Sequence, residues 1–122
     1  MKILIAEDEP IMRKTLEMRL KKDGHEVIVA VDGREALQLL AECDPDLVIT
    51  DIMMPYASGL EVVGAVKQEG KRRIPVIILS AMGQENVVVE AFNLGADDFM
   101  TKPFSPNELS MRVKRFMVLK PG

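Results

Sequence analysis

Five polar residues have side chains that could act together in one site. Each of them follows or ends a short apolar run of the chain. They are two adjacent acids, a third acid, a serine and a lysine: Glu7, Asp8, Asp51, Ser80 and Lys102. Three carboxylates brought together repel one another unless a cation lies among them, and their oxygens suit Mg²⁺. A hydroxyl and an ammonium group can bind phosphoryl oxygens. These types of residue predict phosphoryl-transfer chemistry if the fold brings them together.

The apolar pattern indicates which elements would position these residues. Short apolar runs alternate with amphipathic stretches along the whole chain. The predicted strands are Lys2–Ala6, Glu26–Val31, Asp46–Thr50, Pro75–Ser80 and Asp98–Thr101. The first, third and fourth runs are continuous aliphatics, which is typical of central parallel strands that are covered on both faces.

Helix signals occupy the segments between these strands. Pro10 suits a first helical position and Gly24 the end of that helix. Three later segments place a capping side chain three residues before a glutamate, and these capping residues are Asp32, Ser58 and Ser105. Gly70 and Gly95 are expected to end the third and fourth helices, and the fifth is expected from about Pro106 to Val118. The alternation predicts an α/β fold, a doubly wound five-stranded parallel sheet with five helices.

This fold would gather the polar residues at one edge. In an open α/β sheet, ligands bind beyond the carboxyl ends of the strands, near the point where the strand order reverses. Glu7 and Asp8 follow the first strand, Asp51 the third and Lys102 the fifth, while Ser80 ends the fourth. We therefore expect them to converge. One of the acids Glu7 and Asp8 is also expected to cap the first helix.

Composition narrows the class of protein. The 122 residues suit one domain, and 16 Lys and Arg against 19 Asp and Glu offer no basic surface for nucleic acid or an anionic membrane. The single cysteine favours a reducing compartment, and the first apolar run is too short for a signal peptide or a membrane span. Residues 1–122 are expected to form a single cytoplasmic domain without direct nucleic-acid or membrane binding.

Longer motifs carry a resemblance to a known family. They are Glu7-Asp8, Asp51-Ile-Met-Met-Pro55-Tyr-Ala-Ser-Gly59, Ser80-Ala81, Gly95-Ala-Asp-Asp-Phe99 and Lys102-Pro103-Phe104. Over essentially the whole chain, these motifs resemble the CheY-like receiver domain of two-component response regulators. The resemblance implies the strand order 2-1-3-4-5. It also implies a phosphoacceptor that catalyses only its own phosphorylation and dephosphorylation and is not otherwise an enzyme.

The resemblance further implies a role for each site residue. Asp51 would accept a phosphoryl group from the phosphohistidine of a sensor histidine kinase. Glu7, Asp8, Asp51 and the backbone carbonyl of Met53 would hold Mg²⁺. Ser80 and Lys102 would bind the transferred phosphoryl oxygens. Ser80 would then move toward the phosphoryl group, and the ring of Phe99 would rotate into the space it leaves.

A partner surface is also implied. The C-terminal motifs are closest to receivers of the winged-helix transcription-factor class, which dimerise through the fourth helix, fifth strand and fifth helix. Asp98, Glu108 and Arg112 match that interface, while Val88 stands where a basic residue is usual. A helical wheel assigns Val89, Phe92 and Ala96 to the core. It places Val87, Ala91 and Leu94 on the opposite side, so the predicted partner face comprises Val87, Val88, Ala91, Asp98, Glu108 and Arg112.

Two rival functions differ in class. A phosphohydrolase of the haloacid-dehalogenase type would need a second aspartate two residues after the nucleophile, where this chain has Met53. A flavodoxin-like cofactor binder would need rings to stack on a flavin, and the chain has one tyrosine and no tryptophan. His25 is expected in a surface loop and is not expected to be a phosphohistidine. With no output domain in these residues, a stand-alone receiver and a fragment of a longer regulator both stay open.

Overall fold

The five strands of the computed structural model form one parallel sheet in the order β2-β1-β3-β4-β5. The structure describes residues 1–68 and 74–119. The strands are β1 (Lys2–Ala6), β2 (Glu26–Ala30), β3 (Leu47–Asp51), β4 (Val76–Ser80) and β5 (Asp98–Thr101). The order reverses between β1 and β3, as predicted, so the fold class and topology are confirmed.

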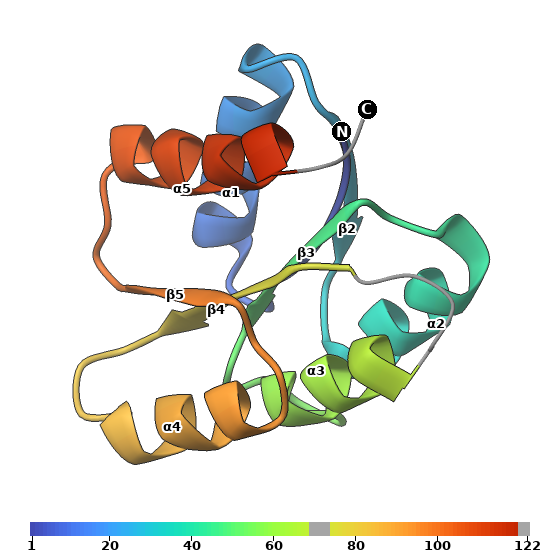
Figure 1. Cartoon of the computed structure of the whole chain (residues 1–122), viewed down its shortest axis with the longest axis vertical. Helices are drawn as coiled ribbons and strands as arrows, with labels where there is room; N and C mark the ends of the chain where they lie inside the picture. Colours follow the sequence, from blue (N-terminus) through green and yellow to red (C-terminus); the bar gives the residue numbers. More distant parts are fainter. Residues whose placement is uncertain (69–73, 120–122) are drawn as a thin grey trace.

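All five predicted helices are present and cover both faces of the sheet. They are α1 (Pro10–Lys22), α2 (Gly33–Cys43), α3 (Gly59–Gln68), α4 (Glu85–Asn93) and α5 (Pro106–Leu119). Helices α1 and α5 lie on one face, and α2, α3 and α4 lie on the other (Figure 1). The prediction that Gly70 ends the third helix falls outside the described residues. Within the described ranges, no helix is long and apolar enough to cross a bilayer.

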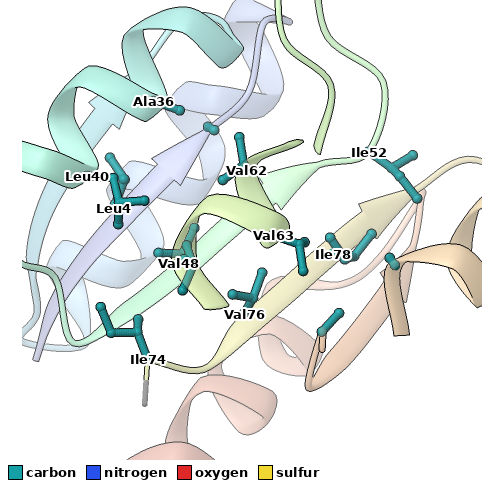
Figure 2. Packing of buried hydrophobic residues seen from close by; sticks show 14 of the residues in the cluster. Leu4, Ala36, Leu40, Val48, Ile52, Val62, Val63, Ile74, Val76 and Ile78 are labelled. Carbon is teal, nitrogen blue, oxygen red and sulfur yellow. The ribbon is translucent and has the colours of Figure 1, made fainter. Parts of the chain in front are cut away.

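The continuous aliphatic runs of the sequence form strands that are buried on both faces of the sheet. Every residue of β3 and β4 is buried. Successive side chains of a strand point to opposite faces, so Val48 packs beneath α2 and α3 while Ile49 packs beneath α1 and α5. Figure 2 shows the first of these two cores, in which Val62 and Val63 of α3 pack over the sheet. Burial of this apolar surface fixes the strand register and hence the strand ends.

Capping side chains begin the helices close to the predicted positions. The side chain of Asp32 accepts a hydrogen bond from the Glu35 N–H at 2.8 Å, and that of Ser105 accepts one from the Glu108 N–H at 3.0 Å. The cap of α1 differs from the prediction. Glu9, rather than Glu7 or Asp8, accepts from the N–H groups of the first turn. Pro10 at the first helical position makes residue 9 the N-cap.

Helix α4 is rotated relative to the prediction. Val88 and Ala91 are 8% and 0% exposed and belong to the core, whereas Val89 and Phe92 are 58% and 40% exposed. The assignment of Val88 and Ala91 to a partner face was therefore wrong, as was the assignment of Val89 and Phe92 to the core. The smaller side chains allow α4 to approach β4 and α3 closely, which leaves the bulkier Phe92 ring on the outer side.

His25 was also misplaced by sequence reasoning. Its side chain is 8% exposed, and its Nδ1 atom lies 3.2 Å from the N-terminal amino group. Pairing of β1 with β2 explains this position, because the Glu26 N–H donates to the carbonyl of Met1 at 3.0 Å. Burial, followed by the nearby amino-group charge, lowers the pKa of His25 below its usual range.

Candidate functional site

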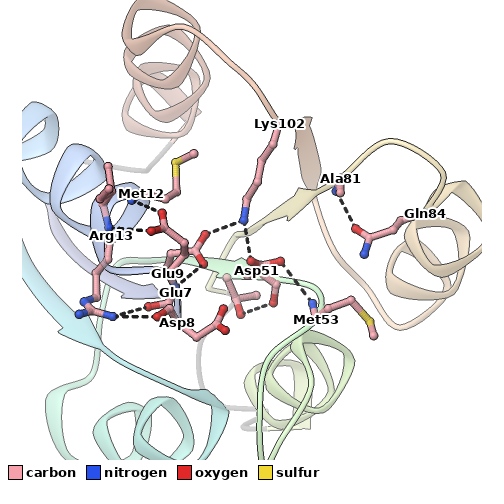
Figure 3. A network of polar contacts seen from close by, with 12 residues as sticks. Glu7, Asp8, Glu9, Met12, Arg13, Asp51, Met53, Ala81, Gln84 and Lys102 are labelled. Atoms are coloured by element: carbon pink, nitrogen blue, oxygen red, sulfur yellow. Dashed lines mark hydrogen bonds and ion pairs between the residues drawn. The ribbon is translucent and has the colours of Figure 1, made fainter.

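The predicted site residues converge at the carboxyl edge of the sheet. Figure 3 shows the acids that follow β1 and the acid that ends β3 grouped with Lys102, which follows β5. Glu7 is fully buried, Asp51 is 7% exposed and Asp8 is exposed. Strand pairing places β3 between β1 and β4, so Asp51 occupies the centre of this edge.

Lys102 joins two of the acids. Its Nζ atom donates to Asp51 Oδ2 at 2.6 Å and to Glu7 Oε1 at 2.8 Å. Burial alone would lower the pKa of Lys102, but the hydrogen bonds and charges of Asp51 and Glu7 outweigh it and raise that pKa. The ammonium group therefore stays charged at neutral pH and is held between the carboxylates of Asp51 and Glu7.

The three acids also form a group suited to a hard divalent cation. Glu7, Asp8 and Asp51 each offer a carboxylate oxygen, and these oxygens lie within 4.8 Å of one another. The Met53 N–H donates to Asp51 Oδ1 at 3.3 Å, which places the Met53 backbone beside the same carboxylate. An all-oxygen donor set with one exposed member leaves room for water ligands, as Mg²⁺ requires. The side chains present therefore fit that ion.

Backbone contacts hold the site residues at their positions. The Lys102 N–H donates to the carbonyl of Ser80 at 2.7 Å, so the ends of β4 and β5 are joined there. The Gly59 N–H donates to the carbonyl of Ile52 at 2.9 Å, which fixes the segment that follows Asp51. Ser80 itself is 2% exposed. The hydroxyl and ammonium residues thus lie on adjacent strand ends, as predicted.

Arg13 contributes to the site, and sequence reasoning did not single it out. Its guanidinium Nη1 donates to the carbonyls of Glu7 and Asp8 at 3.0 and 3.3 Å. The signal available was its place in the first turn of α1, six residues after Glu7. Arg13 fixes the backbone of the acidic pair, so both carboxylates are presented from a rigid segment.

Glu7 is a fully buried acid with a raised pKa. Burial raises its pKa from 4.5 to about 7, against the lowering effect of the Lys102 ammonium and the Glu9 N–H. Because the folded state favours the protonated form, Glu7 contributes stability at low pH that is lost as the pH rises through about 7. In metal-free buffer we expect the unfolding free energy attributable to this group to fall by on the order of 1–3 kcal/mol between about pH 5 and pH 8.

Urea unfolding of the wild type and of Glu7→Gln across that pH range measures this effect. The comparison is necessary because the lowered pKa of His25 acts in the opposite sense, with stability lost as the pH falls. The difference between the two proteins removes the His25 contribution. Parallel pH profiles for the two proteins would contradict the role given to Glu7.

Of the predicted switch and partner face, Phe99 and Asp98 lie on β5, and Glu108 and Arg112 lie on α5. The Phe99 ring is 39% exposed and meets the Phe92 ring edge-on, with the centroids 5.8 Å apart. Asp98 is 8% exposed. Arg112 Nη1 donates to both oxygens of Asp98 at 2.9 and 3.0 Å, and its Nε donates to Glu108 at 3.1 Å. These charged groups are paired within the chain.

Comparison with known sequences places this geometry in a family. A family model described as the response regulator receiver domain matches residues 3–114. The chain is 41% identical over 116 residues to the alkaline phosphatase synthesis transcriptional regulatory protein PhoP of Bacillus subtilis, covering 95% of this chain and 48% of that protein. It is 45% identical over 113 residues to "Probable transcriptional regulator ycf27" of Galdieria sulphuraria, covering 93% and 44%. The chain thus spans about half the length of these relatives.

Solved structures agree with the sequence matches. The receiver domain of Francisella response regulator 1452 superimposes with a TM-score of 0.87 at 34% identity, with 98% of each chain covered. The chemotaxis response regulator CheY4 of Vibrio cholerae gives 0.86 at 31% identity, with 94% of this chain and 97% of that one covered. The phosphohydrolase alternative gains no support from these matches.

Proposed function

This chain belongs to the family of response regulator receiver domains, phosphoacceptors of two-component signalling, and from that premise we propose that Asp51 is its phosphoacceptor. The observation that carries the proposal is the placement of one nearly buried carboxylate against Lys102 at 2.6 Å, in the middle of the acidic cluster. Among the three clustered acids, Asp51 alone ends a strand that is buried along its whole length.

The proposed reaction transfers a phosphoryl group from a phosphohistidine of a sensor histidine kinase. A carboxylate oxygen of Asp51 forms a bond to phosphorus while the phosphorus–nitrogen bond of the donor breaks. The leaving imidazole keeps that electron pair and takes a proton from solvent. Lys102 and Ser80, which lie on adjacent strand ends, would bind the phosphoryl oxygens and stabilise their charge. No separate substrate is turned over.

Glu7, Asp8, Asp51 and the backbone carbonyl of Met53 would hold Mg²⁺ in this proposal. Bound there, the ion would supply positive charge against the phosphoryl oxygens and offset the repulsion among the acids. Lys102 supplies positive charge to two of these carboxylates, Glu7 and Asp51, which supports an electrostatic need for positive charge among these acids. Arg13 keeps the backbone of the acidic pair in place.

Acetyl phosphate with Mg²⁺ distinguishes this function from phosphohydrolase chemistry. A receiver is expected to gain one acyl phosphate per chain that persists for minutes or longer. Repeated turnover, with release of inorganic phosphate well beyond one equivalent and no retained label, would indicate a hydrolase instead. Intact-protein mass spectrometry and a phosphate-release assay report the two quantities on the same sample.

We propose that phosphorylation promotes a homodimer through the outer face of α4 and β5. This face is defined here by Val89, Phe92 and Phe99. These three residues are exposed apolar side chains, and the two rings are in contact. The trigger would be movement of Ser80 toward the phosphoryl group and inward rotation of Phe99. Phenylalanine has no hydroxyl to leave unpaired when buried, so the preference between its two positions rests on packing.

Val89→Glu is expected to weaken the dimer that beryllofluoride and Mg²⁺ promote by about tenfold or more. The reason is that the substitution would bring carboxylates into the apolar interface. Analytical ultracentrifugation measures the association. Ile11→Glu is the matched control, since Ile11 is 77% exposed on α1, which covers the other face of the sheet. Normal association of Val89→Glu, with loss of association in Ile11→Glu, would place the interface on α1.

We also expect the aspartyl phosphate to be long-lived. Met53 and Met82 stand two residues after Asp51 and Ser80, and their side chains are 56% and 81% exposed. A thioether cannot orient the water that must approach the acyl phosphate in line, and its bulk can shield that approach. The double variant Met53→Asn with Met82→Glu should lose phosphate several-fold faster, as followed by mass spectrometry. A decay rate equal to or slower than that of the wild type would refute shielding.

A further inference from the structure

One side chain links the end of β4 to the start of α4. The Gln84 Oε1 atom accepts a hydrogen bond from the Ala81 N–H at 2.6 Å, and Figure 3 shows this contact beside the acidic cluster. Ala81 follows Ser80 directly, so its amide nitrogen belongs to the peptide bond that Ser80 begins. Any displacement of the Ser80 backbone therefore moves the donor of this hydrogen bond.

Gln84 occupies the N-cap position of α4, but its side chain does not cap the helix. No side-chain hydrogen bond from Gln84 reaches the first turn, whereas its backbone carbonyl accepts from the N–H groups of Val87 and Val88 at 3.1 and 3.0 Å. The backbone of Gln84 thus belongs to α4, and its carboxamide is directed to the strand end. A single residue ties the first turn of α4 to the peptide bond that follows Ser80.

We propose that Gln84 is a positioning residue that holds α4 in its resting place through the Ala81 N–H. The inference rests on the proposed phosphorylation of Asp51 and adds a component that acts between Ser80 and the outer face of α4. Movement of Ser80 toward a phosphoryl group displaces the Ala81 N–H from Gln84 Oε1. The first turn of α4 is then released, and with it Val89 and Phe92 on the outer face.

Loss of this hydrogen bond is expected to shift the equilibrium between the resting and activated states toward the activated state. An interaction made only in the resting state favours that state, so its removal favours the activated state and raises the apparent affinity of any ligand that binds the activated state. One neutral hydrogen bond corresponds to about a two- to tenfold change in such an equilibrium. Damage to the fold would act in the opposite direction, because it would weaken binding.

Two substitutions separate the hydrogen bond from side-chain size. Gln84→Met keeps a side chain of similar length and helix propensity but removes the oxygen acceptor. Gln84→Glu keeps an oxygen acceptor at the same distance. Glu85→Met, at the adjacent exposed position, controls for a methionine in the first turn of α4. Beryllofluoride with Mg²⁺ is titrated into the whole chain, and amide resonances are followed by NMR.

Gln84→Met should bind beryllofluoride about two- to tenfold more tightly than the wild type. Before ligand is added, its Val87 and Val88 amide resonances should already be displaced toward their positions in the activated wild type. Gln84→Glu should bind no more tightly than the wild type, and Glu85→Met should behave as the wild type does.

Equal or weaker binding by Gln84→Met, with wild-type protein that binds normally, would overturn the role of Gln84 and leave the phosphoacceptor role intact. Wild-type protein that fails to bind beryllofluoride would overturn the proposed function, and the role of Gln84 with it. The two failures are therefore distinguished by the wild-type titration alone.

Discussion

Asp51→Asn is expected to abolish phosphorylation of the chain by acetyl phosphate and Mg²⁺, reducing the label to background. Asparagine matches the shape of aspartate, but its amide carries no charge and is a poor nucleophile toward phosphorus. Lys102 would retain its hydrogen bond to Glu7 at 2.8 Å, so the surrounding site should remain ordered. Intact-protein mass spectrometry gives the labelled fraction directly.

Asp32→Asn provides the matched control for that variant. Asp32 also follows a parallel strand, and its side chain caps α2 by accepting from the Glu35 N–H at 2.8 Å. Asparagine caps helices about as well as aspartate, so this substitution should leave both the fold and the labelling unchanged. Full labelling of Asp51→Asn, or complete loss of labelling in Asp32→Asn, would contradict the assignment.

Gly59→Ala is expected to destabilise the chain by about 2–4 kcal/mol. A Cβ atom at Gly59 would lie 2.3 Å from the carbonyl oxygen of Asp51 and 2.7 Å from Cα of Ile52. Both neighbours are backbone atoms of the segment that carries Asp51, so they cannot yield without distortion of the site. Urea unfolding should show the loss of stability, and the phosphorylation rate should fall with it.

Gly64→Ala, also within α3, serves as the control for Gly59→Ala. A Cβ atom at Gly64 would meet nothing within 4 Å. Alanine is the better helix former, so this variant should be more stable than the wild type by about 0.5–1 kcal/mol. If both alanine variants had the same stability, the close approach of α3 to the Asp51 backbone would not be a constraint on the fold.

The position of the candidate site could be predicted from the sequence because it follows from a simple rule of parallel sheets. Parallel strands end at a common edge, so polar residues that follow continuous aliphatic runs must gather there. Asp51, Ser80 and Lys102 lie on adjacent strand ends for this reason. The bridging of Glu7 and Asp51 by Lys102 could not be predicted, because it depends on side-chain distances that the spacing of residues does not set.

Helix α4 has a periodicity that sequence reasoning misread. At 100° per residue its polar residues share one face, and they are Glu85, Asn86, Glu90 and Asn93. Val88 and Ala91 lie opposite that face and are buried, while Phe92 lies toward the edge and contacts Phe99. The exposed apolar residues of α4 therefore include Val89 and Phe92 and not the predicted Val88 and Ala91.

The cap of α1 was predictable, whereas the burial of His25 was not. Pro10 marks the first helical position, and this alone identifies Glu9 as the N-cap. The position of His25 depends on the N-terminal residues that pair beside it, since the Nδ1 atom lies 3.2 Å from the amino group of Met1. No local pattern around His25 carries that long-range information.

The central claim, that Asp51 accepts the phosphoryl group, is tested most directly by locating the modification in the wild-type chain. Borohydride reduces an aspartyl phosphate to homoserine, so the modified residue keeps a stable mark through proteolysis. After treatment with acetyl phosphate and Mg²⁺, peptide mass spectrometry should find homoserine at residue 51 alone. Homoserine at Asp8, phosphate on His25, or no modified residue in the chain would contradict the claim.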